Sequence, residues 1–156
     1  AGSYYPIDNF KLSYSFRVRE EDEWLNWIDG NELAVYDLTQ KIISFNMNWF
    51  KGRKHEVRLK SQFVALDAEN PISLISNPDG YLFNHTSDVK PFTQGIASFQ
   101  IRYKYEIAPL SYIYAVYTKG GRVYDDENER NTSKVFKDPW NNPDNEIFSL
   151  KFRLKF

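Results

Sequence analysis

The chain has 156 residues, enough for one domain, and its formal net charge of −1 gives no reason to expect a nucleic-acid binder. It contains no cysteine, which excludes a disulfide framework and a thiolate metal site. Its aromatic content of 17% favours strands, and no apolar run approaches the roughly 20 residues of a membrane helix.

A two-residue alternation of apolar and polar side chains recurs along the chain and predicts an all-β, antiparallel up-and-down meander. Six strands are expected, at about 10–19, 39–50, 54–66, 95–107, 110–118 and 146–156. Most of them are longer than the roughly 5–6 residues of a globular strand. They suit the about 9–11 residues that a tilted membrane strand needs, which indicates part of a transmembrane β-barrel.

The connections between the predicted strands alternate in length. Long loops are expected at 20–38, 67–94 and 119–145, and short turns at 51–53 and 108–109. Long loops are uncommon in compact domains, whereas outer-membrane barrels combine short periplasmic turns with long outer loops. Within the last long segment, Gly120-Gly121 and "DPWNNPDN" indicate turns.

The predicted strands have one apolar face and one strongly basic face. The apolar set, expected to face lipid, contains Phe45, Met47, Phe99, Ile101, Tyr112, Leu150 and Phe152. The basic set, expected to face a lumen, contains Arg17, Arg58, Lys60, Arg102, Lys104, Lys151 and Arg153. Such a row of cations cannot form a dry core, but it can line a wet lumen, where Glu56 and Glu106 would offset some of the charge. A solvated outer face of a soluble sheet stays an alternative.

Several stretches resemble a known family. They are "EDEWLNW", "NWFKGRKHEVRLKSQFVALDAE", "FQIRYKYEIAPLSYIYAVYTKGG", "FKDPW" and the terminal "FRLKF". From about Leu12 onward the chain resembles the C-terminal barrel region of the domain-of-unknown-function 5916 family of Gram-negative outer-membrane proteins. Members of that family carry an N-terminal module similar to family-9 carbohydrate-binding domains, which this chain lacks. The resemblance implies residues 1–156 to be the C-terminal segment of an outer-membrane β-barrel, and it supplies no catalytic residues.

The ending "EIFSLKFRLKF" resembles the sorting signal of outer-membrane barrels. Leu150, Phe152, Leu154 and Phe156 would form this signal, which the barrel-assembly machinery would recognise by pairing along a free strand edge. The alternative is an edge strand of a soluble sheet.

Six strands are too few to close a barrel, since natural outer-membrane barrels begin at about eight. We therefore expect a fragment of a larger barrel, or a chain whose barrel is completed by other chains, held in outer-membrane lipid. The expected function is the wall of a pore or uptake channel with a basic lumen in the bacterial outer membrane. The alternatives are a non-transport anchor for a carbohydrate-binding module and a soluble β-sandwich binding module.

No catalytic site, metal site or cofactor is expected. His55 and His85 have no metal-ligand partner at a suitable spacing, and no G-x-S-x-G motif occurs. A serine hydrolase using His85 is a less favoured alternative. The acidic residues Asp125, Asp126, Glu127 and Glu129 indicate a solvated loop, with a calcium site as the second interpretation.

Overall fold

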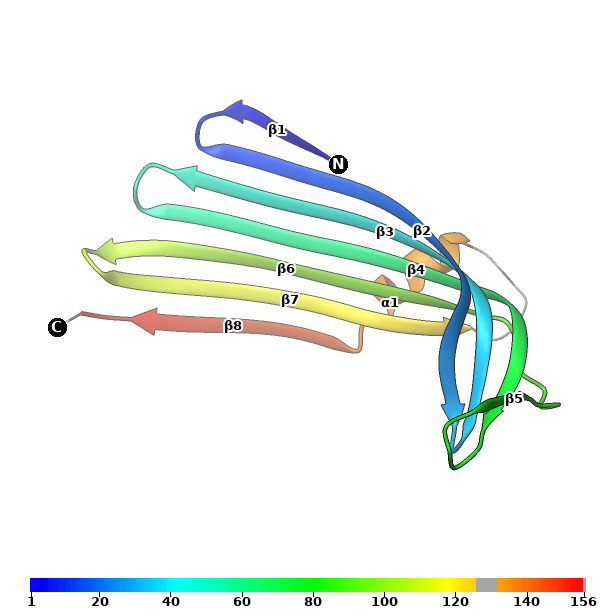
Figure 1. The fold of residues 1–156 in the computed structure, drawn as a ribbon. Coiled ribbons are helices and arrows are strands. Elements are labelled where there is room, and N and C mark those ends of the chain that lie inside the picture. The colour runs from blue at the N-terminus through cyan, green and yellow to red at the C-terminus, as the bar shows by residue number, and fades with distance from the viewer. Residues whose placement is uncertain (126–131, 156) are drawn as a thin grey trace.

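The computed structural model describes residues 1–125 and 132–155. All strands in these residues belong to one antiparallel sheet in the order β1-β2-β3-β4-β6-β7-β8, with β5 paired to β4 (Figure 1). The strands are β1 (Gly2–Ile7), β2 (Phe10–Asp29), β3 (Glu32–Lys51), β4 (His55–Ser76), β5 (Leu82–Asn84), β6 (Phe92–Ala108), β7 (Ser111–Asp125) and β8 (Asn145–Arg153), and the helix is α1 (Thr132–Asn141). The predicted all-β, antiparallel up-and-down fold is confirmed.

The predicted number of six strands is too low, because eight form within the described residues. The N-terminal segment adds β1, which pairs with β2 at one edge of the sheet. Its register shifts between Tyr4 and Ile7, around Pro6. Proline cannot donate a ladder hydrogen bond, so an edge strand is the place that accommodates it.

The predicted loop at 20–38 is wrong, because β2 and β3 run through it to a two-residue turn at Gly30 and Asn31. The second half of β2 follows a register shift between Glu21 and Trp24, where Glu23 has a φ of 58°. An extra residue at such a bulge shifts the two-residue period, so the alternation of the first half of β2 does not continue in phase.

The predicted loop at 67–94 is too long at both ends, because β4 continues to Ser76 and β6 begins at Phe92. The register of β4 shifts at Asn70, which has a φ of 49° and whose Nδ2 donates to Asp37 Oδ2 at 2.8 Å. Pro71 follows at once, and the irregularity again breaks the alternation that the sequence shows.

The predicted loop at 119–145 is wrong over most of its described residues. β7 continues through Gly120 and Gly121 to Asp125, and the "DPWN" of "DPWNNPDN" lies in α1. Glycine is needed where α1 approaches the sheet, since a Cβ on Gly95 would lie 2.0 Å from Val135 O and one on Gly121 would lie 2.2 Å from Pro139 O. Backbone contact of this kind lets the helix lie directly on the strands.

Substituting Gly121 with alanine is expected to displace α1 and to cost about 1–3 kcal/mol of local stability, as overpacking does. The neighbouring variant Gly120→Ala is the matched control, because its Cβ meets nothing closer than Ala97 O at 3.3 Å. Hydrogen exchange of the α1 amides should accelerate in the first variant only. Equal exchange in both variants would show that the close contact does not hold the helix.

The long hairpins of β2, β3 and β4 bend away from the rest of the sheet (Figure 1). The buried core lies at this bend and contains Ala34, Tyr36, Leu38, Ala68 and Phe92, with Trp24, Leu66 and Val89 packed against it. The bulges in β2 and β4 lie in the same region and account for the bend, because bulges increase local twist and curvature. Among the described residues, no helix combines the length and apolar character needed to cross a membrane.

Candidate functional site: two opposite faces of one sheet

The cross-strand register assigns each strand residue to one of two faces, since directly opposite residues share a face. One row crosses the sheet from Tyr14 through Phe45, Ser61 and Phe99 to Lys119. The side containing this row is called the apolar face. The opposite side, which contains Arg58 opposite Arg102, is called the basic face.

The apolar face carries a band of large exposed side chains. The exposed fraction is 62% for Phe16, 42% for Phe45 and 65% for Phe148. On β4 the band runs from Val57 to Ala65, which is nine residues and roughly 30 Å along a strand. A charged residue ends the band on five of the long strands, namely Glu20, Lys41, Asp67, Lys119 and Glu146. A row of charged side chains therefore crosses the apolar face at the end of the band away from the short turns, and exposed apolar side chains such as Trp27 resume beyond it.

Six of the seven residues predicted for the apolar face lie on it, and Tyr112 does not. Tyr112 lies opposite Glu106 and Arg153, on the basic face, and Lys104 Nζ lies 4.4 Å from the centre of its ring. Both faces of β7 are rich in apolar side chains, so alternation alone could not assign this strand. The pairing of Ile113 with Phe152 decides it.

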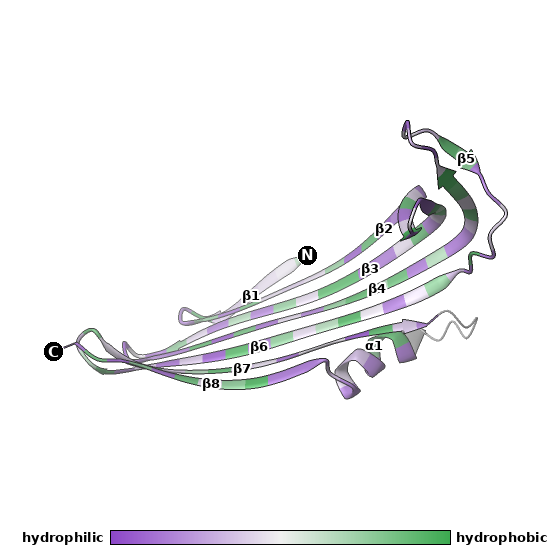
Figure 2. Ribbon diagram, turned by 90° about the horizontal axis from the view of Figure 1, so that it is seen from below, coloured by the Kyte–Doolittle hydropathy of each residue, from purple (hydrophilic) through white to green (hydrophobic). Residues whose placement is uncertain are grey.

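Helix α1 covers the part of the apolar face next to its charged limit. The Trp140 ring packs on Phe63 and Phe99, with centroid distances of 6.2 and 5.6 Å, and Lys119 Nζ lies 4.8 Å from the Trp140 ring centre. Figure 2 shows α1 on the side of the sheet opposite to the one toward which β2, β3 and β4 bend. The apolar face is thus the outer side of the curved sheet.

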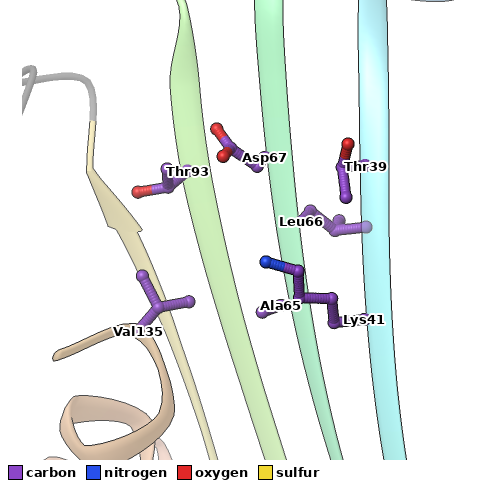
Figure 3. A pocket seen from close by; sticks show the side chains of 7 residues that line it. All are labelled: Thr39, Lys41, Ala65, Leu66, Asp67, Thr93 and Val135. Atoms are coloured by element: carbon purple, nitrogen blue, oxygen red, sulfur yellow. The ribbon is translucent and has the colours of Figure 1, made fainter. Parts of the chain in front are cut away.

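A small cavity of about 30 Å³ lies between α1 and the sheet (Figure 3). It is lined by Thr39, Lys41, Ala65, Leu66, Asp67, Thr93 and Val135. A cavity of this size has room for about one water molecule and for no larger solute. It is therefore a packing defect under the helix rather than a candidate binding site.

All seven basic residues predicted to lie together share the basic face by register. Arg17 lies opposite Ile42, Lys60 opposite Gln100, and Lys151 opposite Tyr114, while Arg58, Arg102, Lys104 and Arg153 occupy the same side of their strands. Toward the bend, neutral polar side chains lie next to these cations on β3, β4, β6 and β7. There Gln62 Nε2 donates to Ser44 Oγ at 3.3 Å, and Gln100 Nε2 donates to Thr118 Oγ1 at 3.5 Å.

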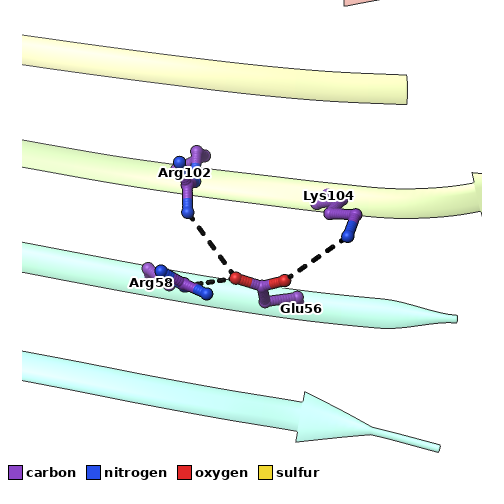
Figure 4. A network of polar contacts seen from close by, with 4 residues as sticks. All are labelled: Glu56, Arg58, Arg102 and Lys104. Carbon is purple, nitrogen blue, oxygen red and sulfur yellow. Dashed lines mark ion pairs between the residues drawn. The ribbon is translucent and has the colours of Figure 1, made fainter. Parts of the chain in front are cut away.

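Glu56 is the centre of an ion-pair network on the basic face (Figure 4). Its carboxylate pairs with Arg58 Nε, lies 3.6 Å from Arg102 Nη2 and lies 3.8 Å from Lys104 Nζ. The Glu56 side chain is 13% exposed, whereas the three cations are 31–45% exposed. One carboxylate therefore offsets three cations, and the cluster keeps a net positive charge.

Lys151 and Arg153 extend this positive charge to β8. Within residues 1–125 and 132–155, neither side chain forms an ion pair with a carboxylate. Together with Arg102 they line an open hollow over β6, β7 and β8 that also includes Tyr114, Val116 and Ser149. Of these three cations, only Arg102 has a carboxylate partner, Glu56, among the described residues, so the hollow keeps a positive charge.

The basic face changes character at the bend, where it carries the buried aromatic cluster. Trp24 lies opposite Tyr36, and the Tyr36 and Phe92 rings pack edge to face with a centroid distance of 5.2 Å. Phe92 also stacks on Tyr124 at 5.1 Å. Burial, with the nearby Tyr124 as a smaller contribution, raises the pKa of Tyr36 above its ordinary value. Tyr36 and Phe92 are buried at this end of the face, whereas the end near the short turns is polar and charged.

The predicted C-terminal signal is only partly described. Leu150 and Phe152 lie in β8 on the apolar face and are 56% and 61% exposed. β8 ends at Arg153, and Leu154, the next residue, is 54% exposed. Phe156 lies outside the described residues.

The two histidines make ordinary side-chain contacts. His55 Nδ1 lies 2.7 Å from the Tyr103 hydroxyl, and His85 Nε2 lies 3.7 Å from Glu32 Oε1. The nearby hydroxyls of Ser73 and Ser87 hydrogen-bond to each other at 2.8 Å rather than to the His85 ring. Most of the acidic cluster that could hold calcium, residues 126–129, lies outside the described residues.

In comparisons with known proteins, no family model, no curated protein and no solved structure matches this chain significantly. The resemblance to the outer-membrane family therefore stays a prediction.

Proposed function

We propose that the chain is a wall segment of a bacterial outer-membrane β-barrel, with the apolar face toward lipid and the basic face toward a water-filled lumen. The observation that carries this proposal is the exposed apolar band, which is bounded by charges and lies opposite a row of cations. Membrane strands alternate lipid-facing apolar residues with lumen-facing polar ones, and the length of the band suits a tilted crossing of the bilayer.

Contact with lipid would explain why the large apolar side chains of the band are exposed, since contact with water is unfavourable for them. Soluble monomers rarely expose contiguous apolar patches beyond a few hundred Å². The described strands form one sheet, so within these residues only α1 covers part of the band. A soluble β-sandwich would need a second sheet over this face, which makes it the weaker candidate.

A pore or uptake channel that favours anions is the function best suited to the basic face. Two like charges about 4 Å apart repel by roughly 1 kcal/mol in water and about 4 kcal/mol at an effective dielectric of 20. Water in a wide lumen, together with Glu56, would keep the repulsion between Arg58, Arg102 and Lys104 small.

An anchor without transport is the second candidate, and the aromatic cluster at the bend favours it. Tyr36 and Phe92 lie on the same side of the sheet as the basic residues, and both are less than 10% exposed. Apolar packing on this side would narrow a lumen at one end. The barrel would then hold a surface or periplasmic module in the membrane.

Closing the barrel would require partners for β1 and β8, which form the two edges of the described sheet. Unpaired strand edges are sites of aggregation, so further strands of a longer chain or of other chains would pair with them. The barrel-assembly machinery and outer-membrane lipid are the remaining partners of this proposal.

A planar-bilayer recording of the intact protein under a salt gradient tests the channel. The reversal potential is expected to show anion selectivity, because the lumen would carry more cations than carboxylates. Neutralising Arg58, Arg102 and Lys151 together should reduce this selectivity. Cation selectivity would contradict the basic lumen, and a complete absence of conductance would favour the anchor.

A further inference from the structure

The hollow over β6, β7 and β8 has the composition of an anion-binding site. Arg102, Lys151 and Arg153 contribute positive charge, and Tyr114 and Ser149 contribute hydroxyl donors. The register places these groups on one side of the sheet, with Tyr114 directly between Lys104 and Lys151. Since neighbouring strands are about 4.8 Å apart, cations on β6 and β8 stand roughly 10 Å apart at the backbone and can reach one anion over β7.

The charge balance shows which part of the basic face is open to a ligand. Glu56 engages Arg58, Arg102 and Lys104. Lys151 and Arg153 have no carboxylate partner in the described parts of the chain. A multiply charged oxyanion would supply the missing negative charge and accept hydrogen bonds from both cations, which are the strongest hydrogen bonds available to such groups.

We infer that this hollow binds a phosphate or sulfate group, either as the free ion or as part of a solute. Lys151 and Arg153 hold the oxyanion from β8, and Arg102 contacts it from β6. The Tyr114 hydroxyl, on β7 between these strands, donates a hydrogen bond to it. Glu56 competes with the ligand for Arg102. The inference deepens the proposed basic lumen and rests on the same face of the sheet.

Calorimetric titration of the intact protein in detergent micelles with inorganic phosphate, at constant ionic strength, tests the site. Lys151→Gln and Arg153→Gln are each expected to weaken phosphate binding roughly tenfold, the value of a charge-assisted hydrogen bond. Arg17→Gln is the matched control, since Arg17 lies on the same face at β2 and does not line the hollow. An equal loss of phosphate affinity in all three variants would mean that the general charge of the face, and not a specific site, binds phosphate. That result would overturn the inference.

Glu56→Gln provides a test that a folding defect cannot imitate. Removing its charge frees Arg102 and should tighten phosphate binding several-fold, whereas unchanged or weaker binding would contradict the proposed competition. A titration with glucose 6-phosphate identifies the source of the group. Binding as tight as that of phosphate indicates a group carried by a solute, and binding of inorganic phosphate alone indicates the free ion.

The titration separates this inference from the channel proposal, because binding in micelles needs no conduction. Phosphate binding without conductance would support the site and contradict the channel. Anion conductance without saturable phosphate binding would contradict the site and support the channel.

Discussion

Replacing Phe45 with arginine is expected to cost about 2–4 kcal/mol of folding stability in lipid vesicles. In the proposed orientation the apolar face meets lipid, so a charge near the middle of the band must leave water. Phe45 is 42% exposed in the structure, and its row on the apolar face contains Tyr14 and Phe99. In a soluble protein the same substitution at an exposed position would change stability by less than about 0.5 kcal/mol.

The matched control is Ser44→Arg, one residue away on the opposite face. Ser44 lies opposite Ser15 and Gln62, so the new cation meets neutral polar neighbours. Its expected cost is below about 1 kcal/mol. Denaturant titration of both variants in vesicles of phosphatidylcholine measures the difference. Equal, small costs would mean that the apolar face does not meet lipid.

The double variant Leu150→Ser/Phe152→Ser is expected to slow assisted membrane insertion at least tenfold. Both side chains lie on the apolar face of the last described strand and are exposed there. Transfer into lipid would bury them and contribute about 1.5–3 kcal/mol for each. The loss would affect both recognition by the assembly machinery and contact with lipid. Lys151→Ser is the control, since Lys151 lies between them on the basic face.

Insertion is followed as the folded fraction over time in proteoliposomes that contain the barrel-assembly machinery. The control variant should insert at the rate of the unaltered protein. If the double variant also inserts at that rate, the C-terminal alternation is an ordinary edge strand and carries no assembly signal.

Alternation predicted the parts of the fold in which the two-residue period is unbroken. The short turns expected at 51–53 and 108–109 lie at residues 52–54 and 109–110, and the faces of β3, β4 and β6 near these turns are as expected. The period fails at Glu23 and Asn70, where residues with positive φ insert bulges. An extra residue leaves no mark on composition, so the alternation predicts loops where β2, β3 and β4 in fact continue.

The candidate site, too, is only partly predictable from the alternation. Alternation was enough to place Arg58 and Arg102 on one side of their strands. Their contact with Glu56 depends on the pairing of β4 with β6, which sets Glu56 opposite Lys104. That register follows from tertiary pairing across the 77–91 connection, and the sequence of one strand does not encode it. The packing of α1 on Gly95 and Gly121 is likewise a tertiary contact.

Cysteine accessibility in lipid vesicles shows which side chains of β3 meet lipid and which meet water, and the chain contains no native cysteine to interfere. Single substitutions are made at consecutive positions 43–49 of β3, and each is reacted with a water-soluble maleimide. A lipid-facing apolar band predicts a period of two, in which Ser44→Cys, Asn46→Cys and Asn48→Cys react and Ile43→Cys, Phe45→Cys and Met47→Cys are protected by lipid. Reaction at all positions, or protection of the even-numbered ones instead, would contradict a lipid-facing apolar band.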